Sequence, residues 1–285
     1  MGEEEGTVTD TPQTHAGFAE ISGAPLYYEV TGVGQPLVLL HQGFADSRMF
    51  DDQVAAFAAH CQVIRYDRHG SGRSGVPSIP YTHHAALRDL LRHLDIARAA
   101  ILGMSMGGAI AIDFTLAYPA MVDALIPVEA AVGGFAASDA TLRQWGEIGA
   151  ALATGDVSGA VGLTLRMWVD GPKRSPAQVD PAVRARMGEM VAHYYANRGD
   201  DPPSLEPPAI GRLGEIGVPT LIIAADGDVP DVLDEADLLH AGIAGSRKEV
   251  IPDVAHVPNM ERPELFNRVV LDFLGALGTA GANGL

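Results

Sequence analysis

The sequence has few cysteines and few basic residues, and each shortage excludes a class of protein. Cys61 is the single cysteine, so an internal disulfide is excluded. Only 19 Lys and Arg stand against 36 Asp and Glu, which gives a formal net charge of -17 at pH 7. Because no basic cluster offsets this charge, we expect no nucleic-acid partner.

Long apolar runs are also missing. No apolar stretch could span a bilayer without charged residues or Gly and Pro breaks, so we expect no membrane partner. Residues 1–10 are acidic and polar and lack the apolar segment of a signal peptide, which favours a cytoplasmic protein. The chain does have 47% hydrophobic and 19% charged residues over 285 positions, the composition of a globular protein with a sizeable core.

Short apolar runs alternate with helical segments along most of the chain. This alternation predicts an α/β fold, in which a mostly parallel sheet is covered by helices on both faces. We expect an antiparallel pair at 18–21 and 26–31, and buried strands at 37–40, 63–66, 99–102, 124–128, 220–224 and 249–251. We expect helices at 47–59, 81–94, 108–118, 233–240 and 263–274.

The alternation stops between residues 133 and 208, where the pattern is helical without a convincing strand and ends in Pro-rich breakers. Such an insertion at the carboxyl end of a sheet is well placed to act as a lid. We therefore expect a core at 17–132 and 209–276 with a helical lid at 133–208. Residues 1–16 are expected to be disordered, and residues 277–285 to form a flexible tail.

The most informative motif is Gly-x-Ser-x-Gly at residues 103–107. A buried strand precedes it, and an apolar helix follows it and stops at Pro119. This context predicts a nucleophile elbow, a sharp strand-to-helix turn that exposes the hydroxyl of Ser105. The turn also directs the backbone amide of Met106 at a developing oxyanion.

Together with four further motifs, the elbow makes the chain resemble the α/β-hydrolase superfamily over about residues 18–276. Within it, the chain looks most similar to small serine esterases, 3-oxoadipate enol-lactonase-like hydrolases and cofactor-free haloperoxidase relatives. The resemblance implies an eight-stranded, mostly parallel sheet with a helical lid. The four further motifs are His41-Gln42-Gly43, the Asp-x-Arg-containing loop at 66–74, the segment 219–228 and the segment 255–263.

Acyl transfer needs a nucleophile, a base and a group that orients the base, and the family order is Ser, acid, His. The resemblance implies Ser105 as the nucleophile, Asp228 as the acid and His256 as the base. The acid stays open, because Asp226 and Asp231 lie in the same loop as Asp228. Glu129, after the sixth strand, is a further alternative.

The resemblance also implies an oxyanion hole made of backbone amides. Met106 supplies one donor, and Gly43 or Phe44 supplies the second, depending on how the loop after His41 is counted. His41 itself is expected to support this loop, and Gln42 either reaches the pocket or is solvated. As substrate-binding residues we expect Phe44, Met104, Trp145 and Trp168, although aromatic and Met side chains at helical spacing also fit a core.

Two further patterns are weaker. Gly-x-Gly-x-x-Gly at residues 70–75 follows a strand, but Pro77 and Pro80 prevent the helix that a dinucleotide site requires. His83 and His84 are adjacent on a helix, and we expect them to be solvated rather than metal ligands. No metal or organic cofactor is implied.

The sequence therefore predicts a serine hydrolase that cleaves a small-molecule carboxylic ester or lactone through an acyl-enzyme on Ser105. Two alternatives use the same fold. One is a carbon–carbon bond hydrolase or cofactor-free perhydrolase with the same triad, and the other is a ligand-binding protein without turnover. The sequence leaves the oligomeric state open.

Overall fold

The computed structural model describes residues 13–197, 199 and 202–282. The expected terminal tails lie mostly outside these residues, at 1–12 and 283–285. At both ends the regular structure extends further than the sequence predicted. The first strand begins at Thr14, and the last helix continues to Ala282, so residues 14–16 and 277–282 are not irregular tails.

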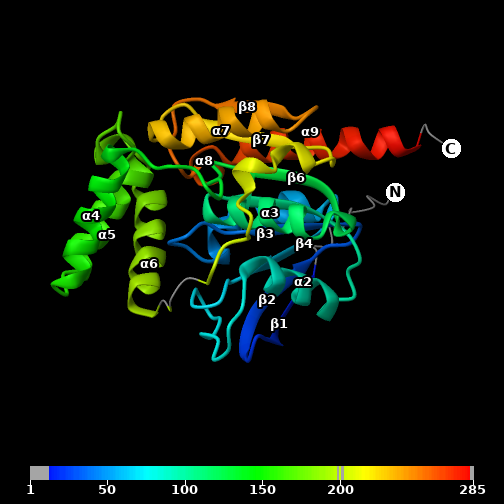
Figure 1. Cartoon of the computed structure of the whole chain (residues 1–285), viewed down its shortest axis with the longest axis horizontal. Helices are drawn as coiled ribbons and strands as arrows, with labels where there is room; N and C mark the ends of the chain where they lie inside the picture. The colour runs from blue at the N-terminus through cyan, green and yellow to red at the C-terminus, as the bar shows by residue number, and fades with distance from the viewer. Residues whose placement is uncertain (1–12, 198, 200–201, 283–285) are drawn as a thin grey trace, which may run out of the picture.

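The strands form one eight-stranded sheet in the order β1-β2-β4-β3-β5-β6-β7-β8 (Figure 1). β1 and β2 form a hairpin, β2 pairs antiparallel with β4, and all pairs from β4 to β8 are parallel. The strands are β1 (Thr14–Ile21), β2 (Ala24–Thr31), β3 (Gln35–Leu40), β4 (Cys61–Tyr66), β5 (Ala99–Met104), β6 (Val122–Val128), β7 (Leu221–Ala225) and β8 (Arg247–Ile251). Every predicted strand is present, and the fold class is confirmed.

Helices cover both faces of this sheet. Apolar side chains of α2 (His83–His93), α3 (Met106–Ala117) and α7 (Pro230–Gly242) pack into one hydrophobic cluster with the sheet. Those of α1 (Asp51–Ala58) and α9 (Pro263–Ala282) pack into a second cluster on the other face. The central strands β3 and β5 are buried on both sides, which is why their sequences are continuous apolar runs rather than alternating ones.

The segment between β6 and β7 leaves the sheet and forms a helical insertion beside its carboxyl edge (Figure 1). It contains α4 (Asp139–Ala153), α5 (Val157–Thr164), a π-helix at Leu165–Asp170, a short 3₁₀ turn at Pro176–Gln178, and α6 (Pro181–Asn197). Ion pairs tie the insertion to the core, among them Arg174 with Glu261 and Arg186 with Asp52.

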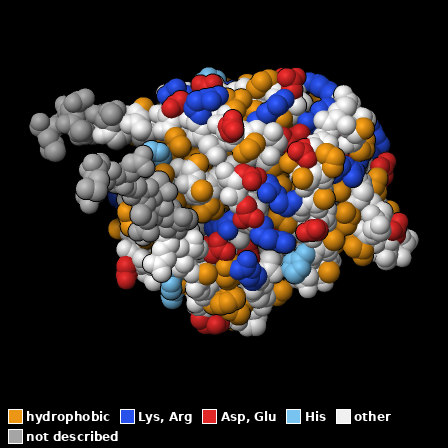
Figure 2. Space-filling view, turned by 180° about the vertical axis from the view of Figure 1, so that it is seen from behind, with side chains coloured by type: hydrophobic (Ala, Val, Ile, Leu, Met, Phe, Trp, Pro, Cys, Tyr) orange, Lys and Arg blue, Asp and Glu red, His pale blue; other side chains and the backbone are white. Residues whose placement is uncertain are grey.

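Charged side chains of both signs are mixed on the rear face of the molecule (Figure 2). Figure 2 shows acidic and basic groups interspersed with hydrophobic ones on the rear face rather than gathered by sign. Among the described residues, no helix is long and apolar enough to cross a membrane.

Candidate active site

Ser105 occupies a strained turn between β5 and α3. Its backbone angles are φ 52° and ψ −115°, a left-handed conformation that non-glycine residues rarely adopt. A Cβ at Gly103 would lie 2.1 Å from the carbonyl oxygen of Gly107, and one at Gly107 would lie 2.3 Å from that of Leu40. Only glycine fits at both places, so the motif's glycines exist to close this turn.

The turn puts Ser105 at the carboxyl end of the central strand and at the amino end of a helix. Its backbone amide donates to the carbonyl of Val128 in the neighbouring β6. Met106 is the first residue of α3, so its amide belongs to the first turn, where backbone donors lack intrahelical partners. This amide and the positive end of the helix favour negative charge beside the serine.

Asp228 and His256 form a buried pair. Asp228 follows β7, His256 follows β8, and their exposed fractions are 1% and 3%. Nδ1 of His256 lies 2.5 Å from Oδ2 of Asp228, and the other oxygen of Asp228 accepts the amide of Val229 at 2.7 Å. Burial alone would raise the pKa of Asp228, but the charge and hydrogen bond of His256 lower it below its usual value.

The other two acids that follow β7 have structural partners instead. Asp226 is exposed and accepts the backbone amide of Asp253. Asp231 accepts the backbone amide of Ser138 and so holds the start of the insertion against α7. Of the three loop acids the sequence offered, Asp228 is therefore the one that contacts His256.

His41 and Arg68 support the loop that carries Gly43 and Phe44. Nε2 of His41 accepts the amide of Arg68 at 2.9 Å, so its proton sits on Nδ1, which donates to the carbonyl of Gln42. Burial, and then the Arg68 charge, lowers the pKa of His41 to about 3, which keeps the ring neutral. The sequence placed His41 here but missed the role of Arg68, although its position in the 66–74 motif was a signal.

The guanidinium of Arg68 fixes the direction of the loop's carbonyl groups. Its Nη2 donates to the carbonyls of Gln42 at 3.1 Å and Gly43 at 3.0 Å. In the part of the chain that the structure describes, the amides of Gly43 and Phe44 have no hydrogen-bond partner. Both stay available as donors, so the choice between them remains a prediction.

Aromatic rings from the insertion lie over this edge of the sheet. Phe44 contacts Trp145, Tyr194 and Tyr195, with ring centroids 5.6–6.0 Å apart. The ring centroids of Trp168 and His256 lie 4.4 Å apart. The backbone carbonyl of Trp168 also accepts a hydrogen bond from the backbone amide of His256. Trp168 belongs to the π-helix, a rare element that is frequent at functional sites.

The structure also bears on three further expectations. Met104 has no exposed surface and packs in a hydrophobic cluster between the sheet and its neighbours, which argues against a contact with substrate. The side chain of Gln42 is buried, with Nε2 near the sulfur of Met187, so the solvated alternative is wrong. His83 is also not solvated: burial lowers its pKa well below the usual value, and its ring packs on Tyr81.

The hydroxyl of Ser105 and the ring of His256 are not hydrogen-bonded to each other among the described residues. Such contacts are often long in unliganded enzymes and tighten when substrate binds. One group of described side chains has the spacing of metal ligands: Glu129, Asp228 and His256, whose ligand atoms lie within 4.8 Å of one another. Since Asp228 and His256 already bond to each other, we interpret this group as a charge network.

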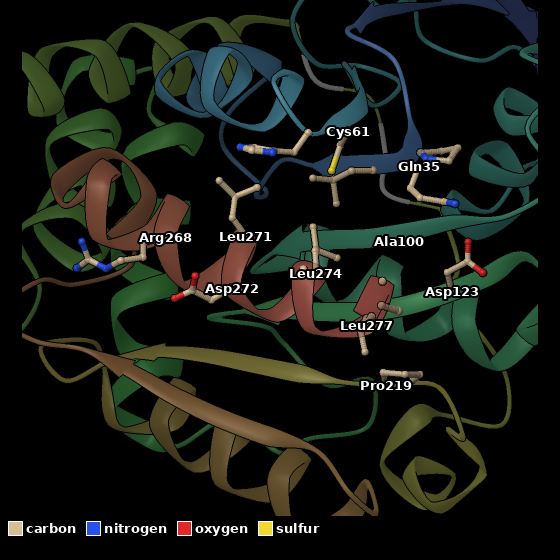
Figure 3. Close-up of a pocket in the computed structure, with 16 residues that line it drawn as sticks. Gln35, Cys61, Ala100, Asp123, Pro219, Arg268, Leu271, Asp272, Leu274 and Leu277 are labelled. Carbon is tan, nitrogen blue, oxygen red and sulfur yellow. The ribbon is translucent and has the colours of Figure 1, made fainter. Parts of the chain in front are cut away.

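A cavity of about 1220 Å³ lies at the opposite edge of the sheet (Figure 3). It is bordered by Cys61 and Ala100, at the amino ends of β4 and β5, and by Leu271, Leu274 and Leu277 of α9. Because Ser105 lies at the carboxyl end of β5, this cavity is separate from the candidate active site.

Comparison with known proteins identifies the family of the chain. The family described as alpha/beta hydrolase fold matches residues 35–263, so the chain belongs to that family. It is similar to the putative carbamate hydrolase RutD of Azorhizobium caulinodans, with 32% identity over 93% of this chain and 99% of the relative.

Two other relatives carry different names. A 2-hydroxy-6-oxononadienedioate/2-hydroxy-6-oxononatrienedioate hydrolase of Cupriavidus pinatubonensis is 28% identical, over 86% of this chain and 89% of the relative. Among solved structures, Est816, an N-acyl homoserine lactone degrading enzyme, is 27% identical with a TM-score of 0.74, over 90% of this chain and all of that chain (100%).

Proposed function

We propose that the protein is a serine hydrolase that cleaves a small carboxylic ester or lactone through an acyl-enzyme on Ser105. The observation that carries this proposal is the strained elbow serine at the same sheet edge as the buried Asp228–His256 pair. An uncharged hydroxyl is a weak nucleophile, and an adjacent imidazole held in one tautomer is the usual means of activating it.

In this mechanism Nε2 of His256 takes the proton of Ser105 while the hydroxyl oxygen attacks the substrate carbonyl. The tetrahedral oxyanion accepts hydrogen bonds from the Met106 amide and from that of Gly43 or Phe44. The imidazolium, stabilised by Asp228, then returns the proton to the leaving alkoxide. Water repeats the sequence on the acyl-enzyme and releases the acid.

We propose that the insertion at 133–208 is the lid of this site, with Phe44, Trp145 and Trp168 as substrate contacts. The support is the ring contact of Trp168 with His256 and the tilted and edge-on contacts of Phe44 with rings from the insertion. These apolar walls favour acyl groups of modest size or aromatic character.

Burst kinetics with p-nitrophenyl acetate and butyrate test the proposal. A p-nitrophenol burst equal to the enzyme concentration, absent in Ser105→Ala, is the expected result. If Ser105→Ala keeps full activity, the proposal fails. A Gly146→Ala variant is the matched control, because a Cβ there meets no described atom within 4 Å.

The named relatives favour two neighbouring activities. A carbamate and a 2-hydroxy-6-oxononadienedioate belong in the same screen, because two relatives are named as hydrolases of these compounds. Turnover of the 2-hydroxy-6-oxononadienedioate without an ester burst would favour carbon–carbon hydrolysis. Ligand-induced stabilisation without any product would favour a binding protein instead.

A further inference from the structure

Glu129 is a buried acid that acyl transfer does not use. It directly follows β6, has an exposed fraction of 1% and adopts φ 44°, a left-handed conformation that is strained for a residue with a Cβ. Its amide donates to the carbonyl of Ile223 in β7, which fixes its backbone beside the strand that leads to Asp228. Burial of a carboxyl group in a strained turn requires an explanation.

The carboxyl group of Glu129 lies beside that of Asp228, within the 4.8 Å group that includes His256. Neither oxygen of Glu129 has a hydrogen-bond partner of normal geometry among the described residues, and the nearby amide of Ala225 offsets the effect of burial on its pKa only in part. Each oxygen of Asp228 accepts one hydrogen bond, from the amide of Val229 or from His256, and can accept a second. Two ionised carboxylates at this separation would repel each other.

Other charges near the pair do not neutralise a second carboxylate. The charge of Lys248 on β8 lowers the pKa of Glu129, but less than burial and Asp228 raise it, and Lys248 is already ion-paired with Asp237. Burial, and then the charge of Asp228, raises the pKa of Glu129 well above its usual value. A proton on Glu129 removes the repulsion between the two carboxyl groups and lets Glu129 donate a hydrogen bond to Asp228.

We propose that Glu129 keeps its proton in the resting enzyme and donates it in a hydrogen bond to Asp228, as a positioning residue for the catalytic acid. Its role in turnover rests on the proposed function, whereas its protonation does not. The network then carries one negative charge when His256 is neutral and none when His256 is protonated. A second negative charge would hold the imidazolium too tightly to return its proton to the leaving group.

The pH dependence of kcat/KM distinguishes a protonated Glu129 from an ionised one. Gln supplies an uncharged N–H donor of the same length, so in Glu129→Gln we expect the acid limb to stay in place and kcat/KM to fall only a few-fold. Glu129→Leu removes the donor, so the acid limb moves to higher pH and kcat falls roughly tenfold or more, the size of one charge-assisted hydrogen bond. An acid limb that moves to lower pH in Glu129→Gln shows an ionised Glu129 and overturns the proposal.

An infrared difference spectrum between the wild type and Glu129→Gln tests protonation without any substrate. We expect the wild type to show the carbonyl stretch of a buried protonated carboxyl group at about pH 8, where Glu235, with a pKa of about 7, is mostly ionised. The same measurement on Glu235→Gln identifies any carbonyl band that comes from protonated Glu235. A carboxylate stretch in place of the carbonyl stretch overturns the proposal, even if the enzyme forms an acyl-enzyme. The carbonyl band in a protein without ester turnover leaves the protonation intact while the proposed function fails.

Discussion

At the scale of single residues, two sets of contacts hold the backbone around the proposed oxyanion hole. Gly107 approaches the backbone of β3 so closely that a Cβ would lie 2.3 Å from the carbonyl oxygen of Leu40 and 2.7 Å from that of His41. Arg68 holds the carbonyls of the loop that follows β3. Both residues act on backbone atoms, so their effects can be separated from those of the triad.

Gly107→Ala is expected to abolish the burst and to lower the free energy of unfolding by about 2 kcal/mol or more, because a buried backbone has to move. Urea denaturation and burst amplitude measure the two effects. Gly146→Ala, in the open face of α4, is expected to stabilise the protein by about 0.5–1 kcal/mol. A Gly107→Ala variant with wild-type activity would contradict the elbow geometry.

Arg68→Lys is expected to lower kcat roughly a hundredfold with a smaller change in KM. A single ammonium cannot replace a planar guanidinium that bridges two carbonyls, and misplacing an oxyanion donor has an effect of this size. Steady-state kinetics on p-nitrophenyl butyrate give the two parameters. Arg92→Lys, on the surface of α2, is the control. A loss of stability with unchanged kcat would show that Arg68 supports packing alone.

At the scale of elements, two acids of α7 hold the segment that follows β6 through hydrogen bonds to its backbone. Oε1 of Glu235 accepts the amide of Val132, and Oδ2 of Asp231 accepts that of Ser138, both at 2.8 Å. The two acids respond to pH in opposite directions. Burial raises the pKa of Glu235 to about 7, whereas hydrogen bonds from Ser138 lower that of Asp231 against the opposing effect of burial.

Glu235→Gln is expected to stabilise the protein most above about pH 7 and to leave it nearly unchanged near pH 4, below the unfolded pKa of 4.5. The folded protein keeps a proton that the unfolded chain, with a pKa near 4.5, has lost. The stability from that proton is present below the unfolded pKa and disappears as the pH rises through 7. Gln keeps the carbonyl acceptor for Val132 without the charge.

Thermal unfolding across this pH range measures the difference, and Asp231→Asn is the control of opposite sign. The lowered pKa of Asp231 contributes stability above its unfolded value of 3.8, so this variant is expected to be destabilised at neutral pH. Equal effects of Glu235→Gln at both ends of the range would contradict the shifted pKa of Glu235.

The sequence predicted the helices and strands better than it predicted the directions of individual side chains. Short apolar runs that end at a turn signal, such as 99–102 before Gly103, favour buried strands of a doubly covered sheet, and the order of Ser105, Asp228 and His256 followed from the resemblance. Side-chain direction was harder. Met104 points into the core, and His83 packs against Tyr81, because partners distant in the sequence decide which face is covered. The π-helix that places Trp168 on His256 has only six residues, too few for its periodicity to be detected in the sequence.

At the scale of the whole molecule, the insertion and the core meet through the loop that carries His256. Arg174, between the π-helix and α6, forms a bidentate pair with Glu261 and also donates to the carbonyl of Asp253. Glu261 in turn accepts the amide of Ala255. The ion pair thus joins the insertion to both ends of the His256 loop, so its loss should affect the chemistry more than substrate binding.

Arg174→Met is expected to destabilise the protein by about 3 kcal/mol, because it leaves the mostly buried carboxylate of Glu261 unpaired. The double variant Arg174→Met with Glu261→Leu removes that charge, so most of the stability should return, as measured by a double-mutant cycle in urea. If the pair positions His256, kcat stays low in the double variant while KM is little changed. Recovery of both stability and kcat would show that the ion pair only fastens the insertion, and that Asp228 and Trp168 suffice to hold His256 in place.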